Sequence, residues 1–253
     1  MRWADSPVRH YLICADPRTG SSLLGYGLWS SDRAGRPDEL LEAETLRKHG
    51  WQDDPPAVLL EKAFRQGETP NGVSGLKVMW PDLERLASAT PPATAEQLRG
   101  LAELLPPLRY IRITRRDVVS QAVSLAKAMQ TGQWQFDKTP RTRTVIYRRE
   151  EISAQIRAIH SYNAGWARYF ETLGVEPLHI VYEDFVDNYD STMRAVFAYL
   201  ELPPDPVPPP LLERQADEVS RAWVERYLHP GMGERVEMAV ASLRRRLAPR
   251  PRG

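Results

Sequence analysis

Cysteine and net charge are both nearly absent from this sequence. Only Cys14 among 253 residues is a cysteine, so no disulfide can form within the chain, and we expect a reducing, cytoplasmic location. Lys and Arg number 34 against 33 Asp and Glu, a net charge of +1. Domains that bind nucleic acid are usually strongly basic, so we expect no nucleic-acid partner.

Long apolar runs and clustered metal ligands are also missing. No stretch approaches the roughly 20 apolar residues of a membrane span. The first apolar run, 11–15, is shorter than the ~7–15 residues of a signal-peptide core, so neither a membrane span nor a signal peptide is expected. The five histidines are scattered, and no His, Cys or Asp spacing suits a metal site, so we predict no metal.

Short apolar segments alternate with helical patterns along the chain. Strands are predicted at 11–15, 73–79, 108–114 and 178–182. Helices are predicted after the first strand and at 81–87, 95–105, 117–129 and 144–173. Strands that alternate with helices need crossover connections, so we predict an α/β fold with a mostly parallel central sheet flanked by helices on both faces.

Proline is plentiful, with 22 residues, and six of them fall within 203–210. Such a run forms a stiff, extended arm. The segment 211–247 that follows is too short to hold a core of its own. We therefore predict one domain, 1–253, in which a C-terminal helical segment packs back on the body.

A polar loop after the first strand has the composition of an anion site. Its residues supply one cation, one glycine and several hydroxyls, and free N–H groups at the start of the next helix would face an anion. The loop lacks the first glycine and the lysine of G-x-x-x-x-G-K-[ST], and it does not match G-x-G-x-x-G. The alternative is purely structural: an N-capped helix that binds no ligand. The residues are Arg18, Thr19, Gly20, Ser21 and Ser22.

A second group of phosphate-binding residue types follows the third strand. Arg115 and Arg116 end that strand, and Ser120 and Ser124 share one face of the next helix. Guanidinium groups and hydroxyls suit phosphate, although a solvated arginine pair is the alternative.

Taken in order, these and other motifs resemble the 3′-phosphoadenylyl-sulfate (PAPS)-dependent sulfotransferases, and within them the trehalose sulfotransferase type. That family has a P-loop-like three-layer fold, and the resemblance runs from about Tyr11 to Tyr227. Each motif is weak by itself, but their number and order are specific. Besides the two phosphate segments, the matching stretches are 35–39, 69–73, 75–80, 130–134, 181–184, 212–217 and 223–227.

The resemblance implies roles for particular residues. The loop residues 18–22 would hold the 5′-phosphosulfate of PAPS, and Arg115 or Arg116 with Ser124 would hold the 3′-phosphate. Arg214 would close over the nucleotide. Glu39 would be the general base, and Lys77 would stabilise the leaving group together with Arg18. His49, the histidine nearest to the expected acceptor region, is the alternative base. The expected product is adenosine 3′,5′-bisphosphate.

The resemblance also implies an acceptor, a hydroxyl of a small sugar or glycosylated metabolite, and a homodimer as in some members. Trp51, Trp80 and Trp134 are candidate stacking faces. Leu40-Leu41 stand where the family tends to place aromatic residues, beside the expected acceptor site. The residues expected to contact the acceptor are Pro17, Arg36, Pro37, Asp38, Glu39 and Trp134.

Two other functions compete with sulfotransfer. A P-loop-type small-molecule kinase would require Mg²⁺ and the missing lysine. A non-catalytic nucleotide-binding module would use the proline arm to bind other proteins.

Overall fold

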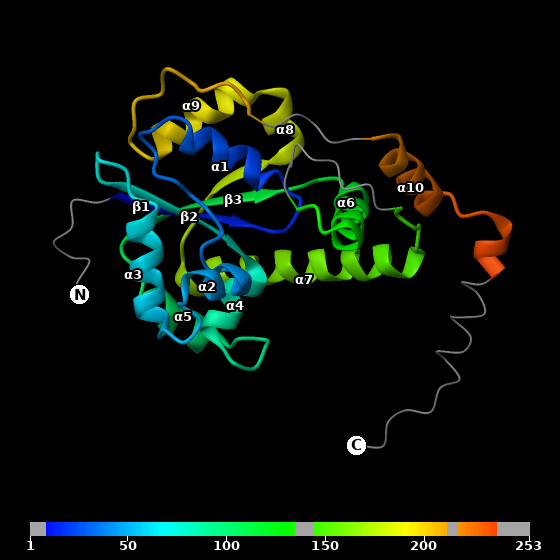
Figure 1. The fold of residues 1–253 in the computed structure, drawn as a ribbon, viewed down its shortest axis with the longest axis horizontal. Helices are drawn as coiled ribbons and strands as arrows, with labels where there is room; N and C mark the ends of the chain where they lie inside the picture. The colour runs from blue at the N-terminus through cyan, green and yellow to red at the C-terminus, as the bar shows by residue number, and fades with distance from the viewer. Residues whose placement is uncertain (1–8, 135–143, 212–216, 237–253) are drawn as a thin grey trace.

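A four-stranded parallel sheet forms the centre of the molecule (Figure 1). The structure, a computed structural model, describes residues 9–134, 144–211 and 217–236. The strand order is β2-β1-β3-β4, with every ladder parallel. The strands are β1 (Arg9–Ala15), β2 (Val73–Met79), β3 (Leu108–Thr114) and β4 (Leu178–Val181). All four strands were predicted, with ends that agree within two residues.

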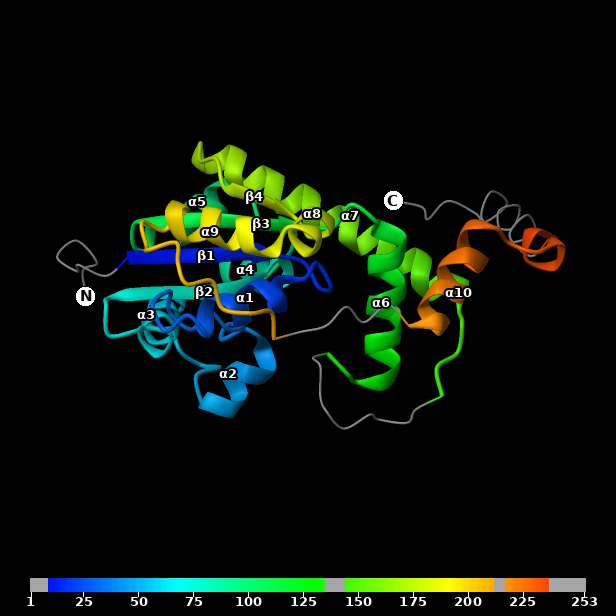
Figure 2. The ribbon, with the colours of Figure 1, turned by 90° about the horizontal axis from the view of Figure 1, so that it is seen from above.

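Helices connect the strands and cover both faces of the sheet (Figure 2). The prediction of an α/β fold with a parallel sheet is therefore confirmed. The helices are α1 (Ser21–Trp29), α2 (Ala43–His49), α3 (Pro56–Gln66), α4 (Trp80–Ala87), α5 (Ala95–Glu103), α6 (Val118–Thr131), α7 (Arg149–Leu173), α8 (Tyr182–Asp187), α9 (Tyr189–Tyr199) and α10 (Glu218–Leu228).

Side chains of β1 alternate between two hydrophobic cores. Tyr11 and Ile13 face one core with residues of α1, α8 and α9. Leu12 and Cys14 face the other, with residues of α3, α4, α5 and α7. Because both faces of the strand are covered, its sequence is continuously apolar rather than alternating. Cys14 is fully buried, and burial raises the pKa of its thiol, which makes it an inert core residue.

The long helix α7 serves two cores. Its C-terminal half packs Trp166 and Phe170 under the sheet, while Ile152 and Ile159 near its N-terminus pack with residues of α6 and with Trp223 of α10. The ring of Trp223 also meets the edge of Tyr147 at 5.7 Å between centroids. As a result α10 lies against α6 and α7, beyond the edge of the sheet (Figures 1 and 2).

The prediction that this helix begins at residue 144 is wrong, because α7 starts at Arg149. The amide side chain of Gln130 explains the difference. It donates to the Ile146 carbonyl at 2.9 Å and accepts from the Ile146 N–H at 2.8 Å, which keeps residues 144–148 out of the helix.

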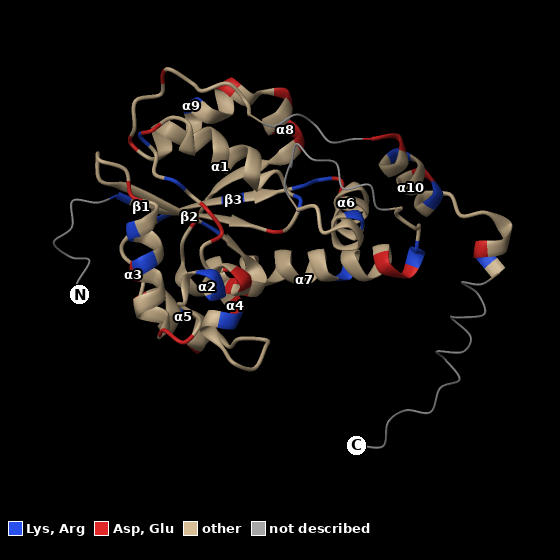
Figure 3. Ribbon diagram, in the orientation of Figure 1, with Lys and Arg blue, Asp and Glu red and all other residues tan. Residues whose placement is uncertain are grey.

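The proline arm runs along the body. Arg33 donates to the carbonyls of Pro203 at 3.1 Å and Pro206 at 2.7 Å, and its guanidinium stacks on Phe197. Charges of both signs are spread over the ribbon (Figure 3). In the described part of the chain, no helix has the length and apolarity that crossing a membrane would require.

Candidate active site

The loop after β1 has a backbone that few residues can adopt. Arg18 and Gly20 both have positive φ angles, 66° and 83°. A Cβ atom on Gly20 would also overlap the ring of Tyr182, so this position needs glycine for two reasons. Helix α1 then begins at Ser21 with no side-chain cap. No side chain therefore occupies its first N–H groups, which is the arrangement that the predicted anion site requires.

A cavity of about 1580 Å³ opens in front of this loop. Its walls come from the loop and α1, the segment 38–48, the start of α4, the β3–α6 turn, α6, α8 and α10. The predicted residues among its lining are Pro17, Arg18, Gly20, Ser21, Ser22, Asp38, Glu39, Arg115, Ser124 and Trp134. The fold thus brings together residues more than 100 positions apart.

Arg18 connects the loop to α6. Its Nε donates to Ser124 Oγ at 2.9 Å, and its Nη1 donates to the Trp134 carbonyl at 2.6 Å. Burial, and secondarily the nearby Arg115, lowers the pKa of Arg18. The two guanidinium groups therefore lie close together beside the loop, where a bound anion would stabilise both charges.

Of the two arginines after β3, one lines the cavity and the other pairs with an exposed carboxylate outside it. Arg115 lines the cavity, and its guanidinium lies over the ring of Tyr182, 4.8 Å from the centroid. Arg116 is outside the lining and makes two hydrogen bonds, of 3.0 and 2.8 Å, to the exposed carboxylate of Asp184. Of the two arginines that the sequence left open, Arg115 is the one that lies with Ser124 at the cavity.

Glu39, Lys77 and Ser22 form a contact chain at the cavity. Lys77 Nζ is 2.8 Å from Glu39 Oε1 and donates to Ser22 Oγ at 3.2 Å. The Lys77 side chain is only 4% exposed, whereas that of Glu39 is 30% exposed. A buried ammonium requires such partners, because burying an unpaired charge costs several kcal/mol. The strand therefore places one cation between the loop and a solvent-accessible carboxylate.

Several other predicted residues lie outside the cavity lining. The Thr19 hydroxyl donates to the Asp16 carbonyl at 2.8 Å and so supports the loop from within. Arg36 is exposed, Pro37 is buried, and neither lines the cavity. His49, the alternative base, also lies outside the lining and stacks on Trp51. Arg214 lies outside the described residues.

Three expectations about the acceptor side are corrected by packing. Leu40 and Leu41 are buried in the core under the sheet, so this departure from the family pattern does not touch the cavity. Trp80 is 2% exposed and packs edge-on against Trp166, so it is a core residue. Trp51 does not line the cavity, whereas Trp134 does and is 51% exposed.

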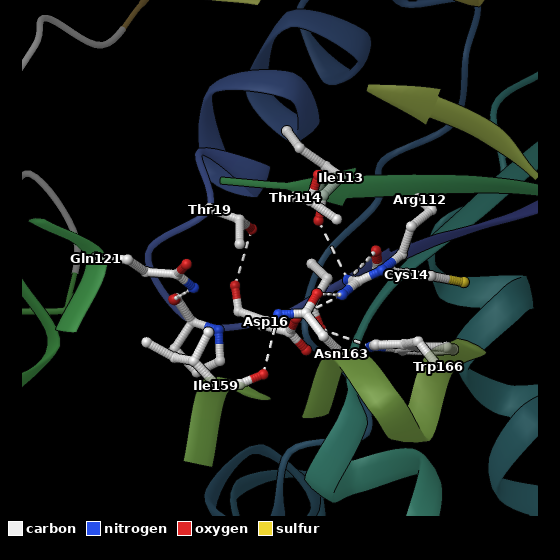
Figure 4. A network of polar contacts seen from close by, with 12 residues as sticks. Cys14, Asp16, Thr19, Arg112, Ile113, Thr114, Gln121, Ile159, Asn163 and Trp166 are labelled. Atoms are coloured by element: carbon white, nitrogen blue, oxygen red, sulfur yellow. Dashed lines mark hydrogen bonds and ion pairs between the residues drawn. The ribbon is translucent and has the colours of Figure 1, made fainter. Parts of the chain in front are cut away.

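A buried polar network supports the loop from below (Figure 4). Arg112 donates to Asp16 Oδ2 at 2.5 Å, to Asn163 Oδ1 at 2.6 Å and to the Cys14 carbonyl at 3.0 Å. Asp16 is fully buried, and burial raises the pKa of its carboxyl, against the opposing effect of Arg112. The Trp166 indole donates to the Ala15 carbonyl at 3.1 Å. Strands β1 and β3 and helix α7 are thus tied together where the loop begins.

Three cavity residues were not among the predicted site residues. Tyr182 and Glu183 belong to a stretch matched only by resemblance, and they reach the cavity because β4 lies beside β3. Arg221 on α10 also lines the cavity, and no hydrogen bond or ion pair of its side chain occurs among the described residues. Only the docking of α10 places it there.

A parallel sheet with a basic, glycine-containing loop at the carboxyl end of a central strand defines the P-loop-like class of α/β proteins. Comparison with known proteins narrows this class. The family model of the Stf0 sulphotransferases matches residues 10–229. The chain belongs to the Stf0 sulphotransferase family and is a transferase enzyme.

Two curated relatives are each named trehalose 2-sulfotransferase. The one from Mycobacterium tuberculosis is 32% identical, and the match covers 87% of this chain and 94% of the relative. The one from Mycolicibacterium smegmatis is also 32% identical, over 88% of this chain and 96% of the relative.

Solved structures show the same fold at much lower identity. A sulfotransferase from Alicyclobacillus acidocaldarius superposes with a TM-score of 0.51 at 17% identity, covering 89% of this chain and 98% of the other. A sulfotransferase domain from the curacin biosynthetic pathway gives 0.52 at 12% identity, covering 94% and 99%. The P-loop-like fold expected from the resemblance is confirmed.

Proposed function

We propose that this enzyme transfers the sulfuryl group of PAPS to a hydroxyl of a small, trehalose-like carbohydrate and releases adenosine 3′,5′-bisphosphate. The relatives' names support a sugar acceptor. The observation that carries the proposal is the Glu39–Lys77–Ser22 chain, which joins an accessible carboxylate to the anion-binding loop through one buried ammonium.

The nucleotide would lie between the loop and α6. The uncapped N-terminus of α1, Ser21, Ser22 and Arg18 offer donors to the 5′-phosphosulfate. Arg115 and Ser124 offer a guanidinium and a hydroxyl to the 3′-phosphate. Because these donors are held by the fold before the ligand arrives, little reorganisation is needed on binding.

Glu39 would take the proton of the attacking hydroxyl as the acceptor oxygen forms its bond to sulfur and the bond between sulfur and the phosphate oxygen breaks. Once Glu39 is neutral, its attraction for Lys77 falls. The ammonium is already 3.2 Å from Ser22 Oγ in the loop and can then stabilise the negative charge left on the phosphate. One lysine thus couples proton removal to departure of the leaving group.

The variant Glu39→Gln tests the base. It keeps the shape of the side chain but cannot accept the proton, so we expect turnover to fall by at least about 100-fold, a typical range for general bases. The readout is release of adenosine 3′,5′-bisphosphate with trehalose as the acceptor. Glu61→Gln, on α3 and outside the cavity, is the matched control. Turnover of Glu39→Gln within a few-fold of the native enzyme would show that Glu39 is not the base.

Ligand-induced stabilisation tests the donor. We expect adenosine 3′,5′-bisphosphate without metal to raise the melting temperature, and Mg-ATP to have little effect, because a ligand that binds only the folded state stabilises it. Stabilisation by Mg-ATP alone would favour the kinase instead. No group of three or more His, Cys, Asp or Glu side chains that could hold a metal occurs among the described residues. The homodimer and the cytoplasmic location remain predictions.

A further inference from the structure

Two tripeptides at neighbouring strand ends contact each other residue by residue. The first tripeptide follows β3 and consists of Arg115, Arg116 and Asp117. The second follows β4 and consists of Tyr182, Glu183 and Asp184. The ring of Tyr182 lies under the Arg115 guanidinium at 4.8 Å. Because β3 and β4 are parallel neighbours, both tripeptides leave the sheet at the same edge and in the same direction.

Glu183 makes the central contacts between the two tripeptides. Its Oε2 accepts from the Arg116 backbone N–H at 3.0 Å, and its Oε1 accepts from the Asp117 N–H at 3.1 Å. The same Oε1 is 3.8 Å from Nε of Arg115. Burial alone would raise the pKa of Glu183, but these backbone donors lower it below its ordinary value, so the carboxylate is charged at neutral pH.

The Arg115 guanidinium is therefore fixed on two sides while it lines the cavity. Tyr182 supports its flat face, and Glu183 attracts its Nε edge. That Nε is buried and has no hydrogen-bond partner among the described residues. Of the guanidinium nitrogens, Nη1 makes a 3.4 Å contact with the Arg18 carbonyl, which places this edge of the group beside the anion-binding loop.

We propose that Glu183 and Tyr182 are positioning residues that fix the Arg115 guanidinium for an anionic group, the 3′-phosphate of the nucleotide. This inference rests on the proposed function. Glu183 does not touch the nucleotide but acts through Arg115. A long arginine side chain that is already held in place loses less conformational freedom when it binds a phosphate.

Whether neutralising Glu183 weakens or tightens nucleotide binding distinguishes a positioning role from a simple charge effect. Glu183 lines the cavity, so neutralising it removes a negative charge near a polyanion, and electrostatics alone would tighten nucleotide binding. If Glu183 positions Arg115, the same change frees the guanidinium and weakens binding. The two explanations therefore predict opposite results for the same substitution.

The experiment measures the Kd of adenosine 3′,5′-bisphosphate and of adenosine 5′-phosphate by calorimetry. For Glu183→Gln we expect at least about a tenfold loss of affinity for the bisphosphate, of the order that one charge-assisted contact supplies, and little change for the monophosphate. The matched control is Asp184→Asn, which neutralises the next residue, an exposed carboxylate that pairs with Arg116 outside the cavity. It should leave both affinities unchanged within about twofold.

A double-mutant cycle tests whether Glu183 acts through Arg115. In an Arg115→Ala background, Glu183→Gln should cost little further affinity, because the group that it positions is gone. Tyr182→Phe keeps the ring under the guanidinium and should bind the bisphosphate nearly as tightly as the native chain does. Tyr182→Leu removes the ring and should bind the bisphosphate more weakly. Circular dichroism spectra establish that each variant is folded.

The outcomes separate the two proposals. Failure of the native chain to bind the bisphosphate overturns the proposed function and this inference with it. Native binding together with unchanged or tighter binding by Glu183→Gln overturns the positioning role alone. Equal losses from Glu183→Gln with and without Arg115 would also refute it.

Discussion

The buried pair Asp16–Arg112 beneath the loop makes a strong prediction about stability. Arg112→Met replaces the guanidinium with an apolar side chain and leaves a fully buried carboxylate without its cation. Removing one partner of such a pair costs about 3–5 kcal/mol. We therefore expect the free energy of unfolding to fall by about that amount, and the melting temperature to fall by roughly 6–20 °C in a chain of this size.

The pH dependence has a definite sign. Burial raises the pKa of Asp16 while Arg112 opposes that rise, so removing Arg112 raises the folded-state pKa further. A carboxyl whose folded pKa exceeds its unfolded pKa binds more protons when folded, and stability falls as the pH rises between the two values. The deficit of Arg112→Met relative to the native chain should thus grow as the pH rises from the folded-state pKa of Asp16 in the native chain to its higher pKa in the variant.

Urea unfolding followed by tryptophan fluorescence at several pH values measures both effects. The control is the double variant Asp16→Asn/Arg112→Met, which removes both charges and should recover part of the loss and abolish the pH dependence. If Arg112→Met unfolded within about 1 kcal/mol of the native chain at neutral pH, the assignment of this pair as a coupled, buried element would be wrong.

Two further predictions concern the loop and α10. Gly20→Ala should lose at least about tenfold in affinity for adenosine 3′,5′-bisphosphate, because the added Cβ would overlap the Tyr182 ring. Gly50 has a similar φ, 68°, but open space around it. The control Gly50→Ala should therefore lose only about 1 kcal/mol of stability, through backbone strain. Trp223→Ala should release α10 from α6 and α7, because a buried tryptophan contributes about 3–5 kcal/mol. Hydrogen exchange should then show faster exchange in α10 alone, and protection equal to the native chain would refute this role.

Local patterns were enough to predict the sheet. Strands β2 and β3 have the predicted ends because each is a short apolar run bounded by polar or turn-forming residues. Helices α2, α3, α8 and α9 were not predicted, although Pro56 at the start of α3 is a typical first helical residue. In α9 the buried Met193, Val196 and Phe197 have helical spacing, but the segment is short and closely follows α8.

Some residues of the candidate site could be predicted from the sequence, and others could be identified only in the structure. Arg18, Gly20 and Ser22 could be proposed from the sequence, because a loop between a strand and a helix makes its own anion site. The sequence could not choose between Arg115 and Arg116, and it suggested Trp80 as a stacking face when that ring belongs to the core. These outcomes depend on which side of a strand or turn a side chain leaves, which neighbouring elements decide.

The alternation of short apolar strands with helical patterns determined the α/β class of this protein, and the order of its motifs indicated the family. The tertiary structure alone decided which charges meet. Lys77 meets Glu39 because of the register of β2 and the path of residues 38–39 beside it, and Glu183 meets Arg115 because β4 lies next to β3. Contacts between residues far apart in the chain depend on strand order and packing, and local residue patterns do not encode these.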